Sequence, residues 1–283
     1  MAYLILAIFS ALSISMLVKD SEQKDQNREI VLASNYLSAA GATLAVLAVE
    51  GAWRFSPTTL ALGAAGGILW PAAFFLQMRG IRDYGMALTI PVARMGLVVP
   101  VGFALLFLAE PLSLQVVVGL VVTISALWFI SPIQFSAFRK LDPGAFWLLP
   151  LILLSFGFVQ LWLVLFNAIG NQAEEFAFIA VIFLASAFFT ILILALRRPR
   201  VETGAVRHGL LLGLPNFLLQ YLLLQSLQSP VFIGRSSMVY ILFSAIGMAL
   251  TFVVGVIFWR EQVTYASVIG LLLAIIAVTI FNL

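Results

Sequence analysis

The chain consists of long apolar stretches, each about as long as a membrane-crossing helix, separated by short polar or charged breaks. A helix needs about 20 apolar residues to cross a bilayer. Ten stretches approach that length: 2–18, 29–49, 58–78, 84–108, 113–131, 146–167, 174–195, 208–227, 231–258 and 263–281. Backbone polar groups in lipid must pair within their own segment, which favours helices. The sequence therefore predicts an all-α integral membrane protein with ten transmembrane helices.

The scarcity of charge supports lipid as the main solvent of this surface. Hydrophobic residues make up 63% of the chain and charged residues 10%, whereas soluble domains carry about 25% charge. The net charge of +3 is too small to predict nucleic-acid binding, and the lack of cysteine excludes disulfides and thiolate metal sites. We expect a multi-pass protein of the plasma (inner) membrane, monomeric or homodimeric, with membrane lipids and a small-molecule substrate as partners and no cofactor or metal.

One segment of the chain occurs twice, with a shift of 151 residues. Phe107 matches Phe258, Glu110 matches Glu261 and Gly119 matches Gly270. This repetition predicts two five-helix repeats, 1–131 and 146–283, joined by a linker loop over 132–145. Because five is odd, the second repeat enters the membrane from the opposite side. Such inverted-topology repeats are a common plan for transporters that work by alternating access.

The basic residues predict the orientation of the chain, because cytoplasmic loops are enriched in Lys and Arg. Even-numbered breaks carry only Arg54 and Arg235. Odd-numbered breaks carry twelve basic residues: Lys19, Lys24, Arg28, Arg79, Arg82, Arg139, Lys140, Arg197, Arg198, Arg200, Arg207 and Arg260. We therefore expect cytoplasmic odd-numbered breaks and extracytoplasmic termini.

The two repeated turns resemble those of the EamA-type families in the drug/metabolite transporter (DMT) superfamily. They read Ala-Glu-Pro at 109–111 before Gly119, and Arg-Glu-Gln at 260–262 before Gly270. The resemblance implies ten helices in two five-helix repeats and transport of metabolites such as amino acids, sugars or phosphorylated compounds. Members are usually described with cytoplasmic termini, whereas the charge pattern of this chain predicts the reverse.

Arg94 is the one charged residue near the middle of an apolar stretch. An ionisable side chain at the bilayer centre costs at least about 2.5–3.5 kcal/mol, so its presence requires a reason. One interpretation is structural, with the arginine capping helix carbonyls beside a break at Pro91. The other is that Arg94 meets a substrate oxygen or carboxylate in a cavity, since no Asp or Glu lies mid-stretch. The matching position of the second repeat is Ala245, so such a site would be asymmetric.

Further polar and aromatic residues fall at helical spacing on other apolar stretches. Each alone suits an ordinary helix–helix hydrogen bond, and this applies also to Asn35, Ser38 and Trp162. Together they predict a polar, aromatic-lined cavity in an apolar shell. The expected substrate-binding residues are Arg94, Trp70, Phe74, Gln77, Gln160, Asn216, Gln220, Ser237, Tyr240 and Ser244.

Two further sets of residues are predicted to be structural. Glu110 and Glu261 stand just before the last helix of each repeat, where a carboxylate can cap exposed N–H groups, with proton coupling as the alternative role. Gly63, Gly66 and Gly67 permit close helix packing.

The predicted function is that of a secondary transporter for a small polar or anionic metabolite, amino acid-like or an organic anion. An enzyme is not expected, because His208 is the sole histidine and no metal or nucleophile constellation is present. Lacking a mid-stretch carboxylate, the chain is predicted to act as a facilitator or exchanger by alternating access. The alternatives are a lipid or amphiphile flippase and a proton-coupled metabolite or drug exporter.

Overall fold

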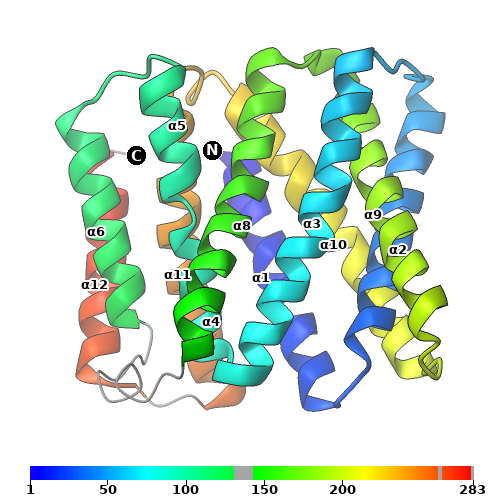
Figure 1. Ribbon diagram of the computed structural model, residues 1–283. Coiled ribbons are helices and arrows are strands. Elements are labelled where there is room, and N and C mark those ends of the chain that lie inside the picture. Colours follow the sequence, from blue (N-terminus) through cyan, green and yellow to red (C-terminus); the bar gives the residue numbers. More distant parts are fainter. Residues whose placement is uncertain (131–142, 261–262, 282–283) are drawn as a thin grey trace. The chain divides into compact units, whose positions relative to one another are not determined.

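The computed structural model describes residues 1–130, 143–260 and 263–281, and every regular element in these residues is helical (Figure 1). The all-α fold class is thereby confirmed, and each of the ten stretches expected to be helical contains a helix. The elements are α1 (Ala2–Gln23), α2 (Arg28–Glu50), α3 (Pro57–Tyr84), α4 (Met86–Met95), α5 (Val98–Phe107), α6 (Leu114–Ile130), α8 (Pro143–Ile169), the 3₁₀ turn η1 (Gln172–Glu174), α9 (Glu175–Arg197), α10 (Thr203–Gln228), α11 (Ser236–Trp259) and α12 (Tyr265–Thr279).

Eight helical runs in the described residues are long and apolar enough to cross a membrane. One of them, Leu88–Phe107, comprises most of α4 together with α5, and the helices α6 and α12 are apolar but shorter. Large apolar side chains are exposed along these helices, among them Leu6, Phe188 and Leu272. A water-soluble protein would cover such faces, so the helices indicate a membrane-embedded protein.

The fourth predicted stretch is interrupted between α4 and α5. The backbone N–H of Leu97 bonds the carbonyl of Arg94 at 3.2 Å, and that of Val99 bonds Gly96 at 2.9 Å, which are 3₁₀-type bonds. Pro100 has no N–H to continue the α-helical ladder. The break expected at Pro91 is therefore wrong, because Pro91 lies inside α4 and the ladder stops one turn later.

The helices form two compact units, each drawing on both halves of the chain. Unit 1 comprises Met1–Ala72 and Trp162–Gln228, and unit 2 comprises Ala73–Leu161 and Ser229–Leu283. Both α3 and α8 contribute to each unit, since the boundaries fall within them. The proposed repeats, 1–131 and 146–283, concern the relation between the sequences of the two halves, and they stay a prediction. Most of the linker expected at 132–145 lies outside the described residues.

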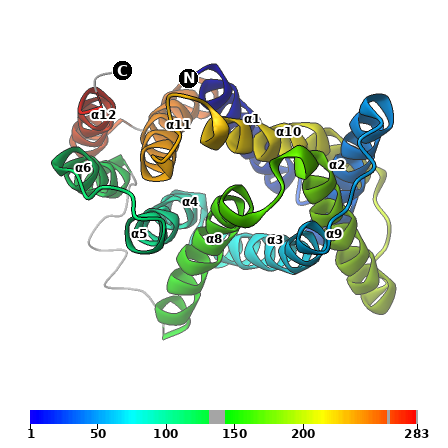
Figure 2. The same cartoon turned by 90° about the horizontal axis from the view of Figure 1, so that it is seen from above.

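In unit 1, α2 packs against both α9 and α10, and α1 packs against α10 (Figure 2). The glycines of α3 lie against α9: an added Cβ at Gly63 would stand 2.6 Å from the Cβ of Val181, and one at Gly66 would stand 3.0 Å from Ile182. The Ser186 hydroxyl donates to the carbonyl of Gly67 at 3.2 Å. The predicted packing role of these three glycines is therefore confirmed.

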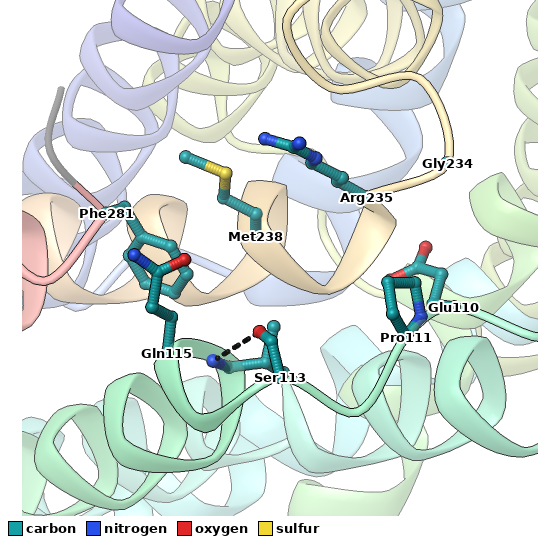
Figure 3. A pocket seen from close by; sticks show the side chains of 9 residues that line it. Glu110, Pro111, Ser113, Gln115, Gly234, Arg235, Met238 and Phe281 are labelled. Atoms are coloured by element: carbon teal, nitrogen blue, oxygen red, sulfur yellow. Dashed lines mark hydrogen bonds between the residues drawn. The ribbon is translucent and has the colours of Figure 1, made fainter.

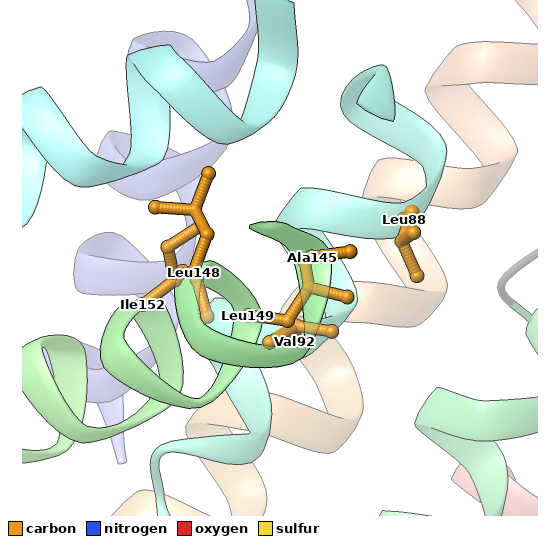
Figure 4. Packing of buried hydrophobic residues seen from close by; sticks show 7 residues of the cluster. Leu88, Val92, Ala145, Leu148, Leu149 and Ile152 are labelled. Carbon is orange, nitrogen blue, oxygen red and sulfur yellow. The ribbon is translucent and has the colours of Figure 1, made fainter. Parts of the chain in front are cut away.

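In unit 2, α6 packs against α12, and α11 contacts α5, α6 and α12. A buried cluster joins α4 to the start of α8 through Leu88, Val92, Leu148, Leu149 and Ile152 (Figure 4). Burying a large aliphatic side chain contributes about 1.5–3 kcal/mol. This cluster fixes α4 against α8 and so determines where the residues of the last turn of α4 lie.

Candidate functional site

Arg94 lies in the last turn of α4 and extends along α11. Its Nη2 donates to the hydroxyl of Thr251 at 3.3 Å, and that hydroxyl donates in turn to the carbonyl of Gly247 at 2.7 Å. The Cζ atom stands 6.0 Å from the ring centroid of Phe243, within the range of a cation–π contact. These three residues of α11 are spaced four apart and share one helix face.

The second terminal nitrogen of the guanidinium has no acceptor. Nη1 of Arg94 is buried and makes no hydrogen bond within the described part of the chain. No carboxylate in that part forms an ion pair with Arg94, and its side chain bonds no helix carbonyl there. The described residues therefore do not support the structural interpretation, in which Arg94 caps helix carbonyls. A buried donor without a partner costs about 1–3 kcal/mol.

Gly247 provides the space for this guanidinium. A Cβ built on Gly247 would stand 2.5 Å from Nη1 of Arg94, so any side chain at this position would require the guanidinium to move. Sequence reasoning did not place Phe243 and Thr251 at the site and predicted only a packing role for Gly247, because two of the three residues carry no polar side chain. The available signal was their common spacing of four residues on α11, the helix that also carries the candidates Ser237, Tyr240 and Ser244.

Two candidate residues of α11 are engaged within the protein. The hydroxyl of Ser237 donates to Oε2 of Glu110 at 2.6 Å, and the Tyr240 hydroxyl donates to the backbone carbonyl of Gln160 at 2.9 Å. Tyr240 therefore makes a helix–helix bond, from α11 to α8, which was the alternative interpretation for such residues. Ser237 instead bonds the turn that precedes α6. Ser244 is buried on the same helix, and the side-chain Oε1 of Gln160 is buried and accepts no hydrogen bond from the described residues.

Unit 1 contains a separate network of amides. Nδ2 of Asn216 donates to Oδ1 of Asn35 at 3.3 Å, and Nε2 of Gln220 donates to Oδ1 of Asn216 at 3.5 Å. Among the described residues, Nδ2 of Asn35 has no acceptor, and neither has Nε1 of Trp70. The network joins α2 to α10, and within the described part of the chain it leaves Nδ2 of Asn35 unsatisfied.

Two other polar residues have the helix–helix contacts that bundles commonly use. The hydroxyl of Ser38 donates to the carbonyl of Leu210 at 2.8 Å, and Nε1 of Trp162 donates to the carbonyl of Leu62 at 2.7 Å. The structural interpretation of these two residues is confirmed.

The ten predicted binding residues divide between the two units. Trp70, Asn216 and Gln220 belong to unit 1. Unit 2 contains the other seven, which are Phe74, Gln77, Arg94, Gln160, Ser237, Tyr240 and Ser244. The single cavity expected to gather all ten stays a prediction.

Glu110 caps a helix, but not the one that follows it. Its carboxylate accepts the backbone N–H of Ser236, the N–H of Ser237 at 3.1 Å and the Ser237 hydroxyl. It therefore caps the start of α11, whereas the hydroxyl of Ser113 accepts from Val116 at the start of α6. Ala109, at φ 51°, is left-handed, and this turn directs Glu110 away from α6. The matching prediction for Glu261 lies outside the described residues.

Glu174 has a similar role that the sequence did not reveal. One oxygen accepts the backbone N–H of Ser56 at 2.8 Å, immediately before α3. The other accepts from Asn171 at 3.0 Å. A carboxylate thus stabilises a helix start in each unit, through a partner distant in sequence.

Comparison with known proteins shows relatives in sequence and in fold. No family model matches the sequence. An uncharacterized protein of Haemophilus influenzae is 23% identical over 288 residues, which cover 97% of this chain and 95% of that protein. A crystal structure described only as that of a protein is similar with a TM-score of 0.75 and 15% identity, over 99% of this chain and 94% of the other. These similarities establish a shared fold across nearly the whole chain.

Proposed function

We propose that this chain is a secondary transporter that moves a small polar or anionic metabolite across the membrane by alternating access. The observation that carries the proposal is Arg94, whose buried Nη1 has no acceptor among the described residues. A planar guanidinium suits carboxylate and phosphate oxygens. A substrate oxygen would supply the missing acceptor and remove the cost of the unpaired donor.

Unit 1 also contains buried donors, at Asn35 and Trp70, that have no acceptor among the residues the structure describes. Buried polar atoms in native proteins are nearly always hydrogen-bonded, so several orphaned donors call for an explanation. A substrate rich in hydrogen-bond acceptors, such as an organic anion or an amino acid, could satisfy these donors, whereas an apolar compound could not.

Helix lengths support the proposal that the chain consists of two related five-helix repeats. The helices α2 and α9 each contain 23 residues and end at a left-handed residue, Gly51 and Arg198 respectively. Both pairs of ends are 147 positions apart. Equal length and equal termination are expected if one ancestral helix gave rise to both.

The last helices of the proposed repeats agree as well. Positions 114 and 265, where α6 and α12 begin, are 151 residues apart. The preceding turns each contain a left-handed residue at matching positions, Ala109 at φ 51° and Arg260 at φ 53°. Thr264, which corresponds to Ser113, likewise caps its helix. The shift first seen in the sequence therefore extends to backbone conformation and capping.

Contacts between breaks support ten crossings, in which odd-numbered breaks share one membrane side and even-numbered breaks the other. The first and seventh breaks meet where the backbone N–H of Asn27 donates to a carboxylate oxygen of Glu202 at 3.4 Å. The second and sixth meet through Ser56 and Glu174. In unit 2, Glu110 of the fourth break caps the start of α11, the helix that follows the eighth break. Each of these three contacts joins positions that the ten-span topology places on one side of the membrane.

The energetics we propose are those of a facilitator or exchanger, as the resemblance to EamA-type transporters permits. Proton-driven carriers usually contain a titrating residue within the membrane, whereas Glu110 is held by three hydrogen bonds at a helix start. An imposed pH gradient alone should therefore not concentrate the substrate in proteoliposomes.

The test is counterflow in proteoliposomes with a panel of amino acids, nucleosides, sugars and organic anions, using Arg94→Ala and Arg94→Lys variants. If Arg94 binds substrate, Arg94→Ala should lose transport by at least tenfold while remaining folded, and Arg94→Lys should restore little because a point charge cannot form a planar bidentate contact. Arg54→Ala is the control, since Arg54 is exposed. Unchanged transport in a folded Arg94→Ala protein would exclude Arg94 from the site, and transport of amphiphiles alone would favour a flippase.

A further inference from the structure

A cavity of about 150 Å³ lies in unit 2 between the turn that precedes α6 and the start of α11 (Figure 3). Its lining includes two charged residues, Glu110 and Arg235. Polar and apolar side chains complete it, among them Gln115, Met238 and Phe281. None of the residues centred on Arg94 lines this cavity, so it is a separate site.

The two charges of the cavity are of opposite sign and do not pair with each other. Glu110 directs its carboxylate to the first residues of α11, where it accepts three hydrogen bonds. A carboxylate has about four acceptor positions, so one remains. Arg235 is exposed, and no described residue forms an ion pair with it. The lining of the cavity therefore includes a cation without an ion pair among the described residues and a carboxylate with one acceptor position left.

The size of the cavity limits its ligand. A protein cavity of about 150 Å³ holds a molecule the size of benzene, which has six non-hydrogen atoms. Alanine also has six. Met238, Val116 and Phe281 provide apolar surface for a short aliphatic side chain.

We propose that this cavity is a peripheral binding site for a small zwitterion of the α-amino acid type. The substrate carboxylate pairs with the guanidinium of Arg235, and its ammonium group donates to the carboxylate of Glu110. As a substrate-collecting site, it rests on the proposed transport function and narrows the substrate class. The same pair of charges would accept the head group of an ethanolamine phospholipid, although its eight non-hydrogen atoms exceed those of alanine.

The experiment is calorimetric titration of the purified full chain in nanodiscs of phosphatidylcholine, which lacks a primary ammonium group. The titrants are L-alanine, propionate, ethylammonium and phosphoethanolamine. We expect alanine to bind at least tenfold more tightly than propionate or ethylammonium, each of which satisfies only one of the two charges. Tighter binding of phosphoethanolamine than of alanine would assign the site to lipid. Equal binding of propionate and alanine would overturn the zwitterion proposal.

Variants locate the binding. Arg235→Gln removes the cation and should weaken alanine binding at least tenfold, and Gln115→Trp should block the cavity from an exposed position. Arg200→Gln is the matched control, since Arg200 is exposed and lies in unit 1. Binding that persists in Arg94→Ala and is lost in Arg235→Gln supports the peripheral site, even if transport fails. Binding lost in Arg94→Ala but retained in Arg235→Gln would overturn the peripheral site and leave the proposed transport function standing.

Discussion

At the scale of single residues, the position of Arg94 depends on neighbours that carry no charge. Phe243 lies beside the guanidinium, Thr251 accepts one hydrogen bond, and Gly247 leaves the space that Nη1 occupies. The side chain is thereby oriented, yet its Nη1 makes no hydrogen bond with any described residue. An oriented guanidinium with an unsatisfied donor is what the proposed substrate-binding role of Arg94 requires.

Gly247→Ala should therefore impair transport without removing any polar group. The new Cβ would stand 2.5 Å from Nη1, so the guanidinium must move, and we expect the apparent substrate affinity to fall by at least tenfold in counterflow assays. Gly102→Ala is the matched control, because a Cβ at Gly102 meets nothing within 4 Å. Equal transport by both variants would mean that the position of Arg94 does not matter to the substrate.

Glu110 should matter for stability rather than for proton movement. Glu110→Gln leaves one acceptor oxygen and places an NH₂ group against the donors of α11, so a buried hydrogen bond is lost at a cost of about 1–3 kcal/mol. A lower midpoint of thermal unfolding in detergent is expected. Glu50→Gln serves as the control, since Glu50 is exposed. An unchanged midpoint with altered pH dependence of transport would favour proton coupling through Glu110.

The sequence predicted the importance of Arg94 but not the bonding partners of the other polar residues, for a physical reason. A lone charge in an apolar stretch identifies Arg94 because burial of a charge is costly, and no structure is needed to see it. The partners of Ser237 and Tyr240 could not be predicted, because a hydroxyl suits a substrate and a neighbouring helix equally well. Glu110 was assigned to the wrong helix, since the turn at Ala109, not sequence adjacency, decides which N–H groups it meets.

At the scale of elements, apolar length predicted a helix in each of the ten stretches, as the described residues confirm, whereas it could not predict the interruption between α4 and α5. Hydropathy is continuous through this region, and the run Leu88–Phe107 reads as one span. The interruption reflects tertiary packing: Gly96 approaches the backbone of α8 so closely that a Cβ would stand 2.6 Å from the carbonyl of Leu153. Such a close approach between two backbones leaves no periodic signal in the sequence.

Gly96→Ala should consequently be more damaging than an ordinary glycine substitution. The added Cβ would also stand 2.7 Å from the backbone nitrogen of Gly157, and main-chain atoms cannot move aside as a flexible side chain can. Overpacking of this kind costs about 1–3 kcal/mol, so we expect reduced yield and a lower unfolding midpoint. Gly41→Ala, where a Cβ meets nothing within 4 Å, should be neutral or slightly stabilising. A wild-type midpoint for Gly96→Ala would show that the two backbones can separate freely.

At the scale of the whole molecule, neither half of the chain contains a complete unit. Unit 1 requires α1 and α2 from the first half together with α9 and α10 from the second, and unit 2 requires α5 and α6 together with α11 and α12. The proposed repeat therefore concerns the sequence and the order of the helices, whereas each compact unit combines helices of both halves. A repeated sequence segment can predict such a repeat, whereas the composition of each compact unit depends on contacts between residues distant in the sequence.

The orientation of the chain in the membrane gives the last prediction. Charge bias assigns odd-numbered breaks to the cytoplasm, and the hydrogen bond from the Asn27 backbone to Glu202 joins the first and seventh breaks. The protein contains no cysteine, so it needs no background removal before single cysteines are introduced at Gln23 and Ala173, both exposed positions. In intact cells an impermeant thiol reagent should label the cysteine at 173 and spare the one at 23, and disrupted cells should label both. The opposite pattern would place the termini in the cytoplasm, as in the families that the chain resembles, and would mean that the twelve basic residues of the odd-numbered breaks do not determine how it inserts.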